Sequence, residues 1–220
     1  MPFQDLFTQY AATGVARQLA LADLLDDRDW QLDLTAGTVT FGTDLHYPIQ
    51  LLGTESEDDG TWLWAWANTD SNLPPAVLLL CGWLREYGRK AGLAELTDPE
   101  FPLERADGHR LALLASGLTG RCYYRGGYDG GAVFFHLDNV PAEVLAPVSA
   151  ERALTVLGQV IQSFPVDHRS AAVAFLHQQG WQVEPANDVV VGRHPGGSEI
   201  RIELDRQGRI SRLDGQVRAH

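Results

Sequence analysis

The stretch WQLDLTAGTVTF, residues 30–41, decides the fold class of this chain. Apolar and polar side chains alternate on both sides of residues 35–37, and a period of two around a short glycine-containing connection predicts a β-hairpin. A second hairpin is predicted directly after it, because residues 47–53 and 61–67 flank a charged turn that ends in Asp-Gly. Four adjacent strands without intervening helices are typical of an α+β fold with antiparallel β-meanders.

Amphipathic helices are predicted on both sides of this meander. Pro2 suits a first-turn position, and apolar residues at helical spacing predict a helix over residues 3–27 with one face packed on a sheet. The turn and capping residues predict three further segments: helices from about residue 76 to Gly92 and from Asp107 to about Leu118, and a hairpin of residues 121–125 and 132–137.

The proline-containing stretch 138–147 is the best candidate for a domain boundary. We expect a helix-plus-meander domain with extra helices and a hairpin over residues 1–140, and a smaller α+β domain of two helices and four strands over residues 149–220. Trp30 and Trp181 each follow a predicted helix and each begin alternating strands. This parallel leaves open a duplicated helix-plus-four-strand unit.

The composition is that of a globular protein. The 220 residues are 45% hydrophobic and 21% charged, which excludes disorder, collagen and coiled coil. Cys81 and Cys122 fall in a predicted helix and at a strand start, so we expect buried thiols instead of a disulfide. The beginning of the chain lacks the basic region of a signal peptide, and no apolar stretch is long enough to span a membrane, so we expect a cytoplasmic protein.

The charge is strongly acidic and unevenly distributed. The net charge is -12, and residues 1–75 contain twelve acidic residues against two basic ones. Such a surface repels nucleic-acid phosphates and anionic lipids, so we expect neither nucleic-acid nor membrane binding. The acidity either keeps the protein in solution or attracts a basic protein partner.

The octet TWLWAWAN, residues 61–68, is the most distinctive segment. In an extended strand Trp62, Trp64 and Trp66 would share one face, and the smaller residues between them would share the other. Three indoles on one face are either a platform that stacks a ligand or the core beneath the first helix. Both interpretations remain open from the sequence.

Other side chains are candidates for binding. His46 and His136 stand at or in predicted strands, and Tyr124 and Arg125 lie at the base of the glycine-rich tip at residues 126–131. The acidic turn offers a surface for a basic partner through Glu55, Glu57, Asp58 and Asp59. The histidines lack the spacing of a zinc helix, there is no Cys-x-x-Cys, and the acidic turn lacks the calcium-loop pattern, so we expect no metal and no cofactor.

The Trp-rich octet, together with QLLGT at residues 50–54 and the hairpin at 30–41, resembles a family of bacterial proteins known only as a domain of unknown function. The resemblance covers about residues 3–137, and the octet is its most specific part. It implies a bacterial, cytoplasmic protein and supplies no catalytic residues. It does not extend to residues 149–220.

These patterns favour a binding protein, with either a small ligand on the Trp face or a basic partner on the acidic surface, as for an immunity protein. The alternative is an enzyme with a pocket between the first helix and the meander, in which His46 or His136 works with Asp33 or Asp44. A scaffold or oligomerisation unit is a third class. The sequence leaves open whether the protein is an enzyme.

Overall fold

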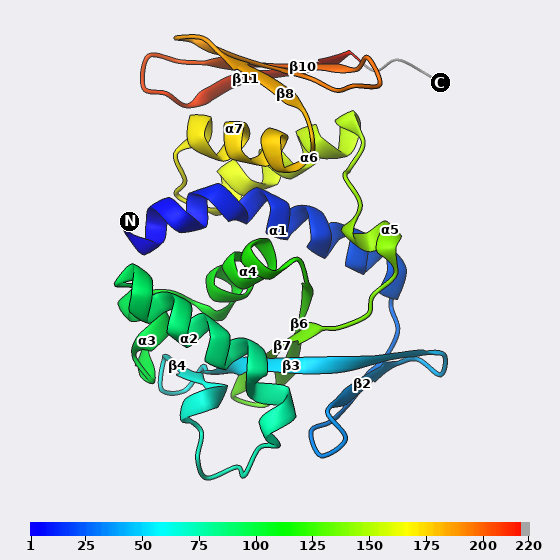
Figure 1. Cartoon of the computed structure of the whole chain (residues 1–220), viewed down its shortest axis with the longest axis vertical. Coiled ribbons are helices and arrows are strands. Elements are labelled where there is room, and N and C mark those ends of the chain that lie inside the picture. The colour runs from blue at the N-terminus through cyan, green and yellow to red at the C-terminus, as the bar shows by residue number, and fades with distance from the viewer. Residues whose placement is uncertain (217–220) are drawn as a thin grey trace.

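Layers of secondary structure are stacked in a computed structural model that describes residues 1–216 (Figure 1). A seven-stranded sheet is followed by helix α4, then α1, then α6 and α7, and finally a four-stranded sheet. The helices are α1 (Phe3–Leu25), α2 (Leu79–Ala91), α3 (Ala94–Thr97), α4 (Gly108–Thr119), α5 (Ala142–Leu145), α6 (Ala150–Ser163) and α7 (His168–Gln178), with the 3-10 helices η1 (Ala65–Ala67) and η2 (Pro75–Leu78). The strands are β1 (Trp30–Asp33), β2 (Thr38–Phe41), β3 (Leu45–Ser56), β4 (Thr61–Trp64), β5 (Glu100–Pro102), β6 (Cys122–Tyr128), β7 (Gly131–Leu137), β8 (Gln182–Pro185), β9 (Val189–Arg193), β10 (Glu199–Leu204) and β11 (Ile210–Gln216).

The larger sheet is organised around β3. Its strands run in the order β1-β2-β3-β4-β5, all antiparallel, and the β6–β7 hairpin joins β3 through β7. Residues 53–56 of β3 pair with β4 and with β7, so these two strands flank it on opposite sides. The predicted α+β class with antiparallel meanders is therefore confirmed, and the first part of β3 pairs with β2.

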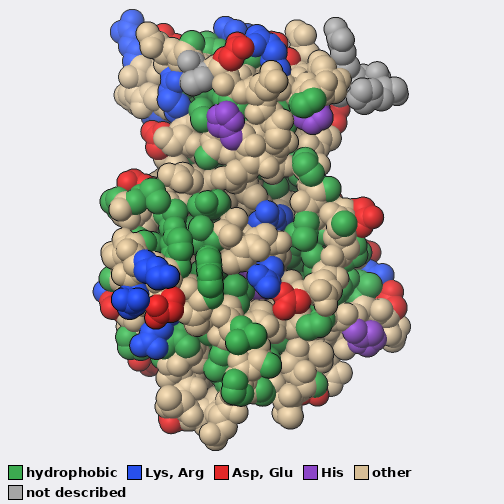
Figure 2. All heavy atoms as spheres, in the orientation of Figure 1, with side chains coloured by type: hydrophobic (Ala, Val, Ile, Leu, Met, Phe, Trp, Pro, Cys, Tyr) green, Lys and Arg blue, Asp and Glu red, His purple; other side chains and the backbone are tan. Residues whose placement is uncertain are grey.

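The smaller sheet is a simple meander in the order β11-β10-β9-β8. Ile200 and Ile202 of β10 are fully buried on its inner face, towards α6 and α7. Its outer face carries charged side chains of both signs, which gather at the top of Figure 2. Both sheets contain consecutive meander strands, while the duplication itself stays a prediction.

Helix α1 lies in the middle of the molecule. The sequence predicted a helix with one face on a sheet, but α1 instead packs against α4 on one side and against α6 and α7 on the other, and it touches the larger sheet at β6 (Figure 1). Gly14 allows the close crossing with α4, because a Cβ atom there would lie 2.8 Å from the Leu113 carbonyl oxygen. The prediction of a single packed face is therefore wrong, because helices contact α1 on two sides.

Several local predictions are confirmed. Asp107 accepts a hydrogen bond from the Arg110 backbone N–H at 2.9 Å and caps α4. Cys81 and Cys122 are both free, buried thiols. Within residues 1–216, no helix has the length and apolar character needed to cross a membrane.

Candidate functional site

The three indoles of the octet do not form a row. Strand β4 ends at Trp64, and the chain then turns into η1, so the strand predicted to continue to residue 67 is wrong beyond Trp64. Trp62 and Trp64 are fully buried, with ring centroids 5.4 Å apart, on the face that α4 covers. Trp66 lies off the strand, with the Arg85 guanidinium 4.0 Å from its ring centroid. The core interpretation holds for Trp62 and Trp64, and we remove them from the candidate site.

Neither candidate histidine has a carboxylate partner within residues 1–216. His136 has no exposed surface, and burial, with a smaller effect from the Arg121 charge, lowers its pKa to about 3. Neither of its ring nitrogens has a hydrogen-bond partner within residues 1–216. His46 is exposed, and its Nδ1 lies 2.9 Å from the Thr40 hydroxyl.

The two carboxylates that an enzyme with a His46 or His136 base would use, Asp33 and Asp44, already interact with other groups of the protein. Asp33 accepts a hydrogen bond from the Ala36 backbone N–H at 2.9 Å, and Asp44 lies 3.5 Å from Arg28. Both aspartates are exposed. The structure therefore gives no support to an acid–base pair built from these residues.

One imidazole does face a titratable partner, and sequence reasoning missed it. His109 Nδ1 lies 2.9 Å from the Tyr123 hydroxyl, at a cleft between α1, α4 and α6. Burial lowers the pKa of His109 and raises the pKa of Tyr123, so both groups are neutral at neutral pH. No local pattern connects these residues, because β6 and α4 come together only in the folded chain.

The acidic turn is divided between the core and the surface. Glu55 is only 7% exposed, and its Oε1 accepts a hydrogen bond from the Gly108 backbone N–H at 2.6 Å, at the N-terminus of α4. A carboxylate is favourable there because of the partial positive charge of the helix end. Glu55 therefore does not lie on the exposed surface where the sequence placed it. Glu57, Asp58 and Asp59 are exposed, as expected, and Glu57 pairs with Arg125 at 3.1 Å.

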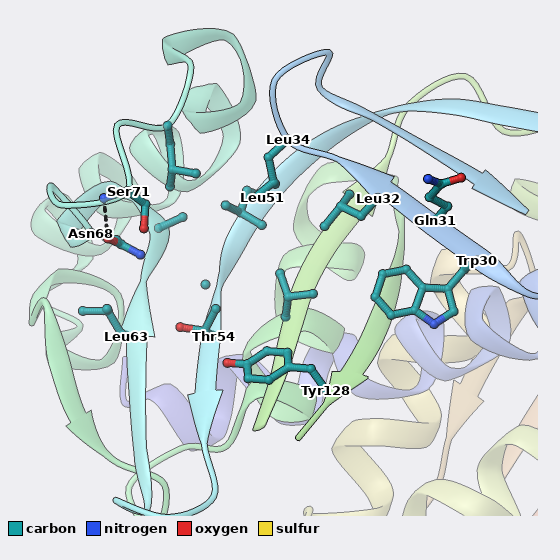
Figure 3. Close-up of a pocket in the computed structure, with 14 residues that line it drawn as sticks. Trp30, Gln31, Leu32, Leu34, Leu51, Thr54, Leu63, Asn68, Ser71 and Tyr128 are labelled. Atoms are coloured by element: carbon teal, nitrogen blue, oxygen red, sulfur yellow. Dashed lines mark hydrogen bonds between the residues drawn. The ribbon is translucent and has the colours of Figure 1, made fainter. Parts of the chain in front are cut away.

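A groove on the outer face of the larger sheet brings together residues that the sequence did not assign to a site. Its volume is about 530 Å³, within the usual range for small-molecule sites. Figure 3 shows side chains of β1, β3, β4, β6 and β7 around it. The lining comprises Trp30, Gln31, Leu32, Leu34, Leu51, Gly53, Thr54, Leu63, Ala65, Asn68, Ser71, Leu73, Tyr128 and Val133.

The alternation of β1 supplies one wall. Trp30 and Leu32, followed by Leu34, are partly buried, whereas the residues between them are exposed. The Trp30 ring sits directly over Gly126, where a Cβ atom would lie 2.4 Å from it. The predicted ligand residue Tyr124 supports this wall from behind, with its ring centroid 5.7 Å from that of Trp30.

An irregularity in β3 shapes the floor. The register with β7 shifts between Leu51 and Gly53, so Leu51 and Thr54 lie opposite Phe135 and Val133. Thr54 also pairs with Leu63 of β4. Leu63 therefore faces away from the buried indoles beside it, and the groove occupies the face of β4 opposite Trp62 and Trp64.

Apart from Gln31 beside Trp30, the polar side chains of the groove lie on the side of β3 and β4. The hydroxyl of Tyr128 points towards Thr54, and Asn68 and Ser71 lie across the groove from Tyr128 (Figure 3). The Ser71 backbone N–H donates to Asn68 Oδ1 at 3.2 Å, which leaves the Asn68 amide N–H groups without a partner within residues 1–216. No lining residue carries a charge. The arrangement can accommodate a neutral, mainly apolar molecule with a hydrogen-bonding group.

Comparison with protein families matches residues 4–140 to a family described as a family of unknown function (DUF6882). Comparisons with curated proteins and with solved structures give no match.

Proposed function

The chain belongs to the family of unknown function DUF6882, and we propose that it is a binding protein that holds a small, neutral, mainly apolar molecule in the groove of the larger sheet. The observation that supports this most strongly is the lack of charge in the groove. The protein has a net charge of -12, yet none of the fourteen lining residues is charged. An uncovered apolar surface is unfavourable in water unless something binds to it.

The shape of the groove favours a flat ligand. Trp30 provides an aromatic wall, and Leu32 and Leu63 provide aliphatic surface. The free N–H groups of Asn68 can donate to one oxygen or nitrogen atom of the ligand. The bacterial origin and cytoplasmic location expected from the sequence remain part of this proposal.

The test uses N-phenyl-1-naphthylamine, a neutral, flat, apolar dye whose fluorescence rises in apolar surroundings. We expect saturable binding to the wild-type protein and at least about tenfold weaker binding to Leu63→Gln, because a buried amide in the groove must give up its water. Leu79→Gln is the matched control, since Leu79 is 68% exposed on α2, outside the groove.

Two outcomes contradict the proposal. One is the absence of saturable dye binding to the wild-type protein. The other is loss of binding in Leu79→Gln with retention in Leu63→Gln, which would place the dye on α2. Circular dichroism of each variant shows whether the fold is retained.

A further inference from the structure

A second, smaller cavity lies where the two halves of the molecule meet. Its volume is about 220 Å³. Helices α1 and α4 contribute residues that lie within the family match, and the segment around α5 and the end of α7 contribute residues beyond it. The lining comprises Tyr10, Thr13, Ala16, Arg17, Gly117, Val144, Leu145, Ala146, Pro147, Gln178 and Gln179.

Arg17 is the only charged residue among those that line this cavity. Its side chain is partly buried and donates through one Nη1–H to the Ser116 carbonyl, near the end of α4. No carboxylate lies within ion-pair distance of it in the described part of the chain. A guanidinium carries five N–H donors, so most of its hydrogen-bonding capacity is unused by the protein.

The other polar side chains leave a surplus of donors. Thr13 donates to Gln178 Oε1, and Gln178 Nε2 donates to the Gln9 carbonyl at 2.9 Å, so these groups satisfy one another. Gln179 is 6% exposed and its Oε1 accepts from the Val148 backbone N–H at 2.9 Å. Its amide N–H groups donate to nothing within residues 1–216.

The absence of acidic lining residues is notable in this chain. The protein contains 29 acidic and 17 basic residues, yet none of the eleven lining residues is acidic. A partly desolvated cation with free donors attracts an anion more strongly than an exposed one does.

We infer that this cavity binds a small organic carboxylate, held by the Arg17 guanidinium and the Gln179 amide. A planar carboxylate accepts two parallel N–H bonds from a guanidinium. The remaining wall includes Val144, Leu145 and Pro147, which offer apolar surface to a short carbon chain and none to an inorganic ion. This site is separate from the groove and does not depend on its ligand.

The position of the cavity gives binding a measurable consequence. A carboxylate in it contacts α1 and the end of α7 at once, so it ties the family-matched part to the remainder of the chain. A ligand that binds only the folded protein raises its stability. Binding is therefore detectable both by calorimetry and by the midpoint of thermal unfolding.

The experiment titrates the full chain with butyrate, with butyramide as its neutral isostere, and with inorganic phosphate, at constant ionic strength. We expect butyrate to bind with a millimolar or lower dissociation constant and to raise the unfolding midpoint, butyramide to have no effect, and phosphate to bind at least about tenfold more weakly. In Arg17→Met the butyrate effect should vanish. Arg121→Met is the control, because Arg121 is already paired with Asp138 at 2.5 Å outside the cavity.

A second variant keeps the test decisive if Arg17→Met does not fold. Gln179→Glu keeps the oxygen that accepts from Val148 and places a carboxylate in the cavity that Arg17 lines. We expect it to fold, to bind butyrate at least about tenfold more weakly and to have a higher unfolding midpoint than the wild-type protein. Equal binding of butyrate and butyramide, unchanged butyrate binding in Gln179→Glu, or no binding to the wild-type protein would overturn the inference. Phosphate binding as tight as butyrate would overturn the assignment to an organic ligand.

Discussion

The two sheets each leave one face without helices, and the two uncovered faces are built differently. On the four-stranded sheet the outer positions carry ion pairs, among them Arg201 with Glu203 at 3.3 Å and Arg212 with Asp214 at 2.7 Å. On the seven-stranded sheet the uncovered face is a groove without any charged lining residue. The contrast is between a face covered with paired charges and a face without lining charges, and we interpret the apolar face as a site.

The largest difference in the free energy of unfolding is expected between substitutions on the two faces of β10. Ile202→Ala removes a fully buried side chain from the inner face of β10 and should lower the free energy of unfolding by about 2 to 5 kcal/mol. Arg201→Ala, its neighbour on the outer face, should leave the free energy almost unchanged. Urea unfolding of both variants measures the difference, and equal losses would show that the outer face also supports the fold.

A second experiment asks whether the covered face of the larger sheet tolerates charge. His136 has a pKa near 3 in the folded protein, well below its ordinary value, because burial disfavours the cation. Between about pH 6.5 and pH 3 the unfolded chain therefore binds a proton that the folded chain does not. Stability falls as the pH falls through this window, by up to about 1.4 kcal/mol per pH unit from this group, and is unaffected by it above pH 6.5.

His136→Phe should remove that part of the pH dependence. The wild-type protein, measured under the same conditions, provides the control. Chemical unfolding at several pH values measures how the free energy of unfolding changes with pH in each protein. An unchanged slope in His136→Phe would mean that the core accepts the charged imidazole and that the contrast between the faces is weaker than the structure indicates.

The third experiment perturbs the groove itself. Gly126→Ala places a Cβ atom where the Trp30 ring lies, and overpacking of this kind should cost about 1 to 3 kcal/mol. It should also shift the indole and weaken dye binding. Gly127→Ala is the control, because its nearest neighbour is the flexible end of Arg125 at 3.4 Å. Chemical unfolding measures the stability of each variant, and dye titration measures its affinity for the dye. Similar stability and similar dye affinity in Gly126→Ala and Gly127→Ala would show that Trp30 is not fixed over Gly126.

The smallest effect should come from the ion pairs of the outer face. Arg193 lies 2.7 Å from Glu184 and 3.1 Å from Glu199, but its side chain is exposed to solvent and salt. Arg193→Gln should lower the unfolding midpoint slightly at low salt and not at all at high salt. Arg206→Gln, in the exposed turn after β10, should show no such salt dependence. A large, salt-independent loss in Arg193→Gln would contradict the view of this face as plain surface.

The fold class followed from the sequence, because alternation and turn residues are local signals. The hairpin over residues 30–41 and the cap at Asp107 were predicted for this reason. The end of β4 was missed, since the alternating octet gives no sign that the chain turns after Trp64. Glu55 was misplaced because an acidic run reads as an exposed turn, whereas pairing extends β3 through Ser56 and turns Glu55 towards α4.

The candidate sites were harder to predict because their walls are distant in sequence. The groove needs β1 to lie over β6, and that contact depends on the pairing of β3 with β7. The alternation of the octet predicts that Leu63 faces away from Trp62 and Trp64. Only the folded chain shows that Trp30 closes the groove on this face of the sheet. Arg17 was not assigned to a site, because nothing in the sequence around it reveals the helices that pack on both sides of α1.

The central place of α1 has a consequence for how the chain is made. This helix is synthesised before α6 and α7, but Gln4 bonds to the Pro165 carbonyl and Thr13 bonds to Gln178, so two of its contacts wait for residues 165–178. Until α6 and α7 emerge from the ribosome, one flank of α1 is bare and available to other nascent chains or chaperones. A product that stops after residue 140 would keep that bare flank permanently, and we expect it to aggregate or be degraded although it contains the whole family-matched segment.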